Sequence, residues 1–220
     1  MRKFLCLSAG CAALLAAFVL PSAAGAQELP RANPSPGHPS PGHPSGGHPS
    51  SIMRHEAPSL RDLSQDELFE MLKIAPNEAS AKPAERELLR RFRESDSDTI
   101  DLFMGWASQA MNGEEWGAAL DVLDRVVILD PGFAEGWNKR ATAHFAQKEY
   151  GKSIADIERT LQIEPRHFGA LVGLGMILRE LDEKDEAIAA FKAALAIHPQ
   201  LTEAREALEE LEKEQAGQDI

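Results

Sequence analysis

The sequence predicts an all-α protein, a right-handed α-solenoid of helical hairpins that follows a disordered N-terminal segment. Two observations lead to this prediction. From Leu60 onward, apolar residues recur with helical periodicity, and prolines fall almost entirely between the predicted helices. In the same region, Pro131, Pro165 and Pro199 follow one another at a spacing of 34 residues. A fixed period of this length is typical of stacked helical repeats.

The first 26 residues have the composition of a secretory signal peptide. Arg2 and Lys3 precede an apolar run over residues 4–20, and Ala24 and Ala26 are the small residues that a signal peptidase accepts. We therefore expect cleavage after Ala26 and a periplasmic or secreted protein. A retained membrane anchor is the alternative, because the apolar run is at the short limit for a membrane span.

Cleavage would change both the thiol content and the charge of the protein. Cys6 and Cys11 lie inside the predicted signal, so the exported chain would have no disulfide, thiol nucleophile or thiolate metal site. Loss of Arg2 and Lys3, with no acid removed, changes the net charge from -12 to -14. Such a surface repels phosphate backbones and anionic lipid heads, so we expect neither nucleic acid binding nor membrane binding after cleavage.

Residues 27–59 form a tether rich in Pro, Gly, His and Ser that we expect to be disordered. It contains G-H-P-S three times at five-residue spacing, and its histidines could bind zinc, copper or nickel. These histidines are His38, His43, His48 and His55. Neighbouring histidines of an extended chain would lie about 15 Å apart, so chelation requires the chain to collapse. A spacer is the preferred interpretation, and a metal-handling tether is the alternative.

Further columns of similar side chains share the period of the prolines. Large residues at Phe103, Trp137 and Leu171 are expected to fill the space between the two helices of each hairpin. Small residues that let the helices approach occur in two columns: Ala107, Ala141 and Gly175, and Ala119, Ser153 and Ala187. Each proline ends a second helix because it lacks an N–H group. The pattern predicts helices at 100–112 and 117–129, 134–147 and 151–163, and 168–180 and 185–197.

This pattern resembles the tetratricopeptide repeat (TPR) family, whose repeat reads W-x2-L-G-x2-Y, then A-x3-F, then P. The third repeat matches best, with Leu171, Leu174, Gly175, Leu178, Ala187, Phe191 and Pro199. The resemblance divides the array into repeats at 100–133, 134–167 and 168–201. In the second repeat, Arg140 and His144 replace the family's Leu and Tyr, so its first helix is expected to pack less tightly. The order of signal, tether and array is similar to that of exported TPR proteins of Gram-negative bacteria.

Helical segments are also predicted on both sides of the array. Residues 60–99 fit the repeat phase as a degenerate leading hairpin whose first helix is cut short by Pro76. Ser64 and Glu67 have the spacing of a capping box. Residues 202–216 are expected to form a capping helix with a polar outer face. His167 and His198 flank repeat-ending prolines and are expected to favour the carboxyl end of the preceding helix.

The resemblance implies that a partner binds in a concave groove lined by the first helices. The positions that face this groove in the family register are Met104, Ser108, Met111, Asn138, Thr142, Phe145, Val172, Met176 and Arg179. Methionines and phenylalanine would give the groove an adaptable apolar lining. Packing of these positions on the leading hairpin, or on a second copy of the protein in a homo-oligomer, is the alternative.

Some family members bind a partner's C-terminal carboxylate through a clamp of Lys, Asn and Arg. The corresponding residues here are Met104, Ser108, Lys139, Gly169 and Gly173, so this mode of recognition is not expected. The sequence has no nucleophile elbow, phosphate loop or H-E-x-x-H motif. We therefore expect a non-enzymatic scaffold without a cofactor, which binds a protein or peptide segment of an envelope protein.

Overall fold

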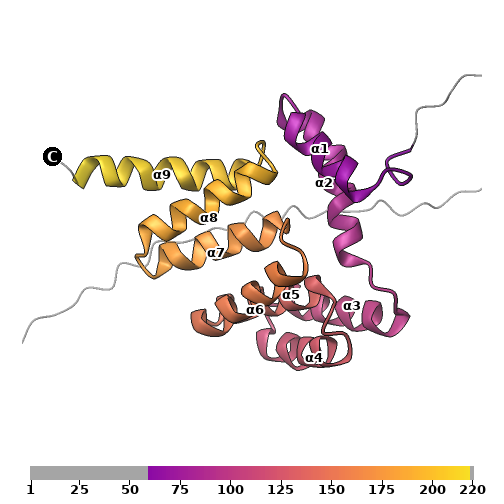
Figure 1. Cartoon of the computed structure of the whole chain (residues 1–220). Coiled ribbons are helices and arrows are strands. Elements are labelled where there is room, and N and C mark those ends of the chain that lie inside the picture. Colours follow the sequence, from indigo (N-terminus) through magenta and orange to yellow (C-terminus); the bar gives the residue numbers. More distant parts are fainter. Residues whose placement is uncertain (1–58, 219–220) are drawn as a thin grey trace, which may run out of the picture. The chain divides into compact units, whose positions relative to one another are not determined.

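The computed structural model describes residues 59–218, which form nine α-helices and no strand (Figure 1). The helices are α1 (Gln65–Ile74), α2 (Glu78–Arg93), α3 (Asp98–Asn112), α4 (Trp116–Leu129), α5 (Ala134–Ala146), α6 (Tyr150–Ile163), α7 (Phe168–Glu180), α8 (Lys184–Ile197) and α9 (Thr202–Gln218). The predicted all-α solenoid class is confirmed. The predicted signal peptide and the tether histidines lie outside the described residues.

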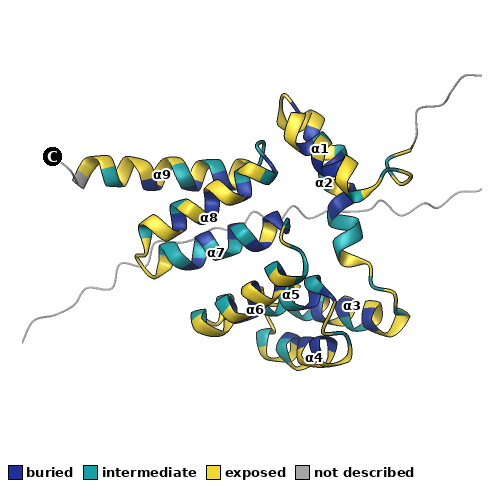
Figure 2. Cartoon of the chain, in the orientation of Figure 1, coloured by how far each residue is buried: buried dark blue, intermediate teal, exposed yellow. Residues whose placement is uncertain are grey.

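Helices α3 to α8 form three successive hairpins, and each second helix also packs against the first helix of the next hairpin. All six small residues of the two predicted columns are buried between these helices (Figure 2). The approach is closest at Gly175, where an added Cβ atom would lie 2.7 Å from Cε1 of Phe191. Close packing of the helices therefore depends on these small residues, as predicted.

The turns inside the three hairpins share one backbone conformation. Glu114, Lys148 and Asp182 are spaced 34 residues apart and have φ angles of 57°, 60° and 62°. These values lie in the left-handed region, which residues other than glycine adopt at a cost. Gly113 has a φ of -86° instead, so the left-handed position of the first turn falls one residue after its glycine.

The second repeat contains ion pairs where apolar contacts were expected. Arg140 binds the carboxylate of Asp156 through two hydrogen bonds, Nη2 to Oδ1 at 2.6 Å and Nε to Oδ2 at 2.8 Å. Its Nη1 donates to Oδ1 of Asp124 at 2.8 Å. Trp137 is only partly buried, and Arg140 lies 4.8 Å from the centre of its ring. The expectation of looser packing is wrong, because α5 and α6 pack as extensively as α7 and α8.

Helices α1 and α2 form a leading hairpin with a capped start at each helix. The predicted capping box is confirmed: the N–H of Ser64 donates to Oε2 of Glu67 at 2.7 Å, and the N–H of Glu67 donates to Oγ of Ser64 at 3.2 Å. The backbone and side-chain hydrogen bonds from Ser64 lower the pKa of Glu67. Helix α1 ends at Ile74, two residues before Pro76, as the sequence predicts.

The leading hairpin does not stack on α3 as a preceding repeat of the array would. Within the described residues, α1 packs against α8 and α2 packs against α5, and neither has a substantial contact with α3. Phe92 stacks on His167 with ring centres 4.6 Å apart, and Nη1 of Arg166 lies 2.7 Å from Oδ1 of Asp66. The hairpin is thus held by α5, by α8 and by the turn between α6 and α7. This corrects the expectation that residues 60–99 continue the array as a degenerate repeat.

Helix α9 begins at Thr202, where the sequence predicts the capping helix. It packs against the third repeat through Ala204, Ala207 and Leu211, while its glutamates remain exposed (Figure 2). None of the described helices is long and apolar enough to span a lipid bilayer.

Candidate functional site

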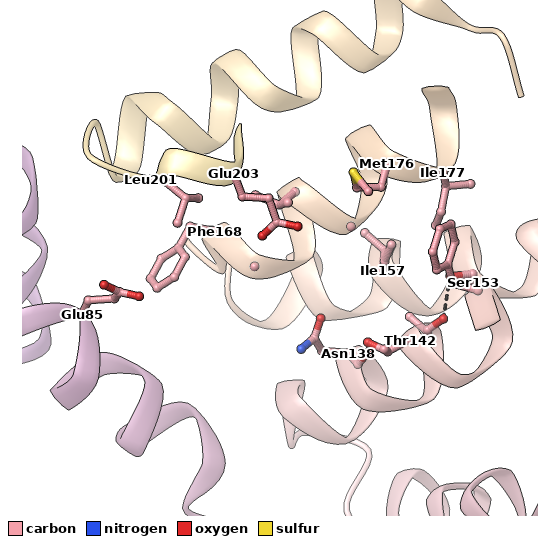
Figure 3. Close-up of a pocket in the computed structure, with 15 residues that line it drawn as sticks. Glu85, Asn138, Thr142, Ser153, Ile157, Phe168, Met176, Ile177, Leu201 and Glu203 are labelled. Atoms are coloured by element: carbon pink, nitrogen blue, oxygen red, sulfur yellow. Dashed lines mark hydrogen bonds between the residues drawn. The ribbon is translucent and has the colours of Figure 1, made fainter. Parts of the chain in front are cut away.

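A pocket of about 380 Å³ lies between α2, α5, α6, α7 and the start of α9 (Figure 3). Its apolar lining consists of Ala141, Phe145, Ile157, Phe168, Gly169, Val172, Gly173, Met176, Ile177 and Leu201. Its polar lining consists of Glu85, Asn138, Thr142, Ser153 and Glu203. The first helices of the second and third repeats, α5 and α7, supply most of these residues. A volume of this size is within the range of ligand pockets, roughly 300–1,000 Å³.

The predicted groove residues of the second and third repeats come together at this pocket. Those that line it are Asn138, Thr142, Phe145, Val172 and Met176. A shallower depression shares Met176 and Glu203 with the pocket and is also lined by Arg179. Six of the nine predicted positions therefore line the pocket or the depression beside it. Their role in binding a partner stays a prediction.

The predicted groove residues of the first repeat lie elsewhere. Met104 is only 7% exposed and belongs to a core that includes Leu123 of α4 and Ala143 of α5. Met111 packs against the same core, and Ser108 is partly exposed outside the pocket. The expectation that Met104 and Met111 line the groove is therefore corrected, because α3 turns both toward the helices that follow it, whereas the expectation for Ser108 stays a prediction.

Gly169 and Gly173, on α7, line the pocket without a side chain. A Cβ atom added at Gly173 would lie 3.6 Å from Cδ1 of Ile157, and one at Gly169 would lie 3.5 Å from Cε1 of His167. Both are ordinary van der Waals distances, so a Cβ atom at either position is compatible with the fold. A side chain there would occupy the pocket. Gly169 and Gly173 correspond to the positions of basic residues in the carboxylate clamp of some family members. In this chain the same two positions leave space in the pocket.

Hydrogen bonds fix the polar residues at the base of the pocket. Oγ of Ser153 donates to the carbonyl oxygen of Ala141 at 2.7 Å and ties α6 to α5 (Figure 3). Oγ1 of Thr142 donates to the carbonyl oxygen of Asn138 at 3.0 Å. Nδ2 of Asn138 donates to Oε2 of Glu135 at 2.8 Å. Because these donors are already bonded within the fold, the base of the pocket offers mainly apolar contact.

A buried pair supports the junction between α5 and α7. Nε2 of His167 lies 3.1 Å from Oε2 of Glu135, and both side chains are less than one-tenth exposed. Burial raises the pKa of Glu135, but the interactions with His167, Lys139 and Asn138 outweigh it, and the pKa is lowered.

The hydrogen bond at Nδ1 of His167 decides which ring nitrogen is protonated. Nδ1 accepts a hydrogen bond from the N–H of Ala170 at 3.0 Å, so the proton is on Nε2, which donates to Glu135. His167 therefore caps the start of α7 and does not favour the end of α6, which corrects its predicted role. His144 is also buried, with Nδ1 2.7 Å from Oε2 of Glu149.

Carboxylates lie along the open side of the pocket. Glu85 on α2 and Glu203 on α9 direct their side chains toward it (Figure 3). Glu206 and Glu210 line the neighbouring depression. Arg179 is the one base among the residues that line either hollow, and its Nη1 lies 3.6 Å from Oε2 of Glu210. The residues that line the pocket and the depression therefore include four carboxylates and one guanidinium, which is already paired.

Three residues that line the pocket were not predicted from the sequence: Glu85, Leu201 and Glu203. Glu85 belongs to the leading hairpin, Leu201 is the last residue of the third repeat and Glu203 follows it, so none of the three is among the groove positions of the first helices. Among residues 59–218, no cluster of three or more His, Cys, Asp or Glu side chains is arranged to hold a metal ion.

Comparison with known proteins relates the chain to one family. A family model described as "Tetratricopeptide repeat" matches residues 104–165 and 152–202. A TPR repeat-containing protein of Rhizobium etli is 40% identical over 152 residues, which cover 69% of this chain and 74% of that protein.

Solved TPR domains have a similar fold. The Arabidopsis OM64 TPR domain gives a TM-score of 0.51 at 23% identity and covers 54% of this chain and 98% of that domain. The first TPR of Spaghetti (RPAP3), solved bound to the HSP90 peptide SRMEEVD, gives a TM-score of 0.53 at 19% identity and covers 55% of this chain and 96% of that structure. Domains of this kind generally mediate protein–protein interactions, and none of these findings indicates catalysis. By its repeat columns, its stacked hairpins and its relative in Rhizobium etli, this chain belongs to the tetratricopeptide repeat family.

Proposed function

We propose that this protein is an exported scaffold that binds a segment of another cell-envelope protein in the pocket between α5 and α7. The observation that supports this proposal most is the apolar pocket itself, around which predicted groove residues from two repeats come together. Stacked repeats commonly present a concave surface of this kind to an extended or helical segment. Gly169 and Gly173 on α7 leave room for side chains of such a segment.

Substitution of Gly173 tests the use of the pocket. Gly173→Leu should fill the pocket while the Cβ atom makes only ordinary contact with Ile157. Gly151→Leu is the matched control, because Gly151 lies on α6, is exposed and has no neighbouring atom within 4 Å of an added Cβ. A partner crosslinked in intact cells and identified by mass spectrometry should be lost with Gly173→Leu and kept with Gly151→Leu. Equal recovery with both folded variants would contradict the proposed site.

The proposed export rests on the sequence of residues 1–26. Expression of the full chain in a Gram-negative host should give a periplasmic or secreted product. Edman sequencing of that product should start at Gln27. A product that stays in the cytoplasm with Met1 intact would contradict export, and a membrane-bound product that retains residues 1–26 would identify an anchor.

The repeated G-H-P-S units support a second candidate function, metal handling by the tether. Replacement of His38, His43 and His48 by Ala should then abolish retention of zinc or copper. If metal retention is unchanged while partner capture persists, the tether is a spacer.

A further inference from the structure

We propose that the pocket binds a cationic segment, in which apolar side chains are flanked by Arg or Lys. This inference rests on the proposed function and specifies the chemistry of the partner. It follows from the charges around the pocket and from the absence of free cations among its lining residues.

Three of the carboxylates that line the pocket or the depression lie on one face of α9. Glu203, Glu206 and Glu210 are spaced three and four residues apart, so they lie on the same side of the helix. All three are exposed, and Glu203 and Glu206 make no ion pair with any described residue. These two carboxylates are therefore available to a bound cation.

Glu85 extends the negative charge to the opposite wall. The nearest basic groups are Nε2 of His198 at 3.7 Å and Nζ of Lys82 at 4.0 Å. Burial lowers the pKa of His198, so its imidazole is neutral at pH 7 and does not neutralise Glu85. Lys82 is half exposed to solvent and screens Glu85 only weakly.

The lining lacks cations that could accept an acidic partner. Gly169 and Gly173 occupy positions where clamp-type relatives have basic residues. Lys139 follows the lining residue Asn138 in the sequence, but it is not a lining residue and its Nζ lies 3.6 Å from Oε1 of the buried Glu135. An acidic tail such as SRMEEVD, seen in the RPAP3 complex, would meet like charges here. An apolar segment flanked by cations could instead contact the apolar lining and pair with the carboxylates beside the pocket.

The test uses three synthetic peptides that share one Leu-Phe centre and differ only in flanking residues, which are Lys, Glu or Ser. Fluorescence anisotropy measures their binding to the exported full chain. The Lys-flanked peptide should bind about tenfold more tightly than the Glu-flanked peptide at low salt, and the ratio should shrink as salt is added. Gly173→Leu should abolish binding, and Gly151→Leu should not.

A charge-matched pair of variants tests the face of α9. Glu203→Gln with Glu206→Gln should weaken binding of the Lys-flanked peptide by about three- to tenfold, the size expected for two exposed ion pairs. Glu209→Gln with Glu212→Gln removes the same charge from α9 but lies outside both hollows, so affinity should be unchanged.

Several outcomes would overturn the inference and identify the cause. Equal binding of all three peptides, lost with Gly173→Leu, would keep the pocket as the site and reject a cationic partner. Binding of the Lys-flanked peptide that survives Gly173→Leu would show adsorption to the acidic surface. Absence of binding by every peptide would reject the inference, and the crosslinking experiment would then decide the proposed function separately. Self-association that Gly173→Leu abolishes would identify a second copy of the chain as the occupant.

Discussion

Replacement of Arg140 by Leu should destabilise the second repeat because it leaves a buried carboxylate without its partner. Asp156 is only 4% exposed and receives two hydrogen bonds from Arg140. Leucine is the residue at the same column of the third repeat, Leu174, where the position corresponding to Asp156 is Ala190. The chain itself therefore supplies an apolar alternative to this ion pair.

The expected loss can be estimated from the burial of the two partners. Breaking a buried ion pair typically costs about 3–5 kcal/mol. We expect the lower end, about 3 kcal/mol, because the Arg140 side chain is 18% exposed and Nε2 of His144 lies 3.9 Å from Oδ2 of Asp156. The pair with Asp124 adds little, because Asp124 is 57% exposed.

A double-mutant cycle measures this interaction. Urea unfolding followed by circular dichroism should give the largest loss for Arg140→Leu, a smaller loss for Asp156→Ala, and stability within about 1 kcal/mol of the original chain for the double variant. If Arg140→Leu lowers the free energy of unfolding by less than about 1 kcal/mol, the ion pair does not stabilise the fold as expected. A double variant as unstable as Arg140→Leu would show that lost packing of the long side chain, and not unpaired charge, is the cause.

Three further predictions concern packing and pH. Gly175→Ala should lower stability by about 1–3 kcal/mol in calorimetry because its Cβ would lie 2.7 Å from the buried Phe191 ring, and an unchanged melting temperature would contradict this. His198→Leu should be neutral or stabilising, since neither ring nitrogen has a hydrogen-bond partner. Burial lowers the pKa of His198 in the folded protein, so protonation of this residue favours the unfolded chain as pH falls below ~6.5. The stability of His198→Leu should therefore depend less on pH between about pH 7 and 5. Equal slopes of stability against pH for the variant and the original chain would refute this. The hydrogen bond from Arg90, with a further bond from Arg91, lowers the pKa of Glu87 to about 2, so the stability from this pair is present above the unfolded value of 4.5 and is lost as pH falls toward 2. Glu87→Gln should therefore reduce acid sensitivity in a pH titration of helix content, and an unaltered titration would contradict this assignment.

Much of the fold was predictable because its signals are local and repeated. The prolines end second helices, and the small-residue columns mark where helices approach, so α3 to α8 were located to within a few residues. The capping box of Ser64 and Glu67 involves residues only three positions apart, so it was also predictable from the sequence. The groove positions of the second and third repeats follow from the same register, which is why Asn138 and Met176 lie together at the pocket.

The remaining features depend on contacts between segments far apart in the chain, for which the repeat register contains no signal. Ala75 accepts a hydrogen bond from Gln200, and Glu78 accepts one from Thr202. Such contacts place the leading hairpin beside the later repeats, and they bring Glu85 to the pocket.

The sequence by itself therefore determined the repeat period, the helices and the lining of the two later repeats. Only the tertiary structure decided that Met104 is a core residue, that Asp156 pairs with Arg140, and that carboxylates from α2 and α9 flank the pocket. The physical reason is that periodic side chains specify how adjacent helices pack, whereas the charge of a site depends on every segment that reaches it.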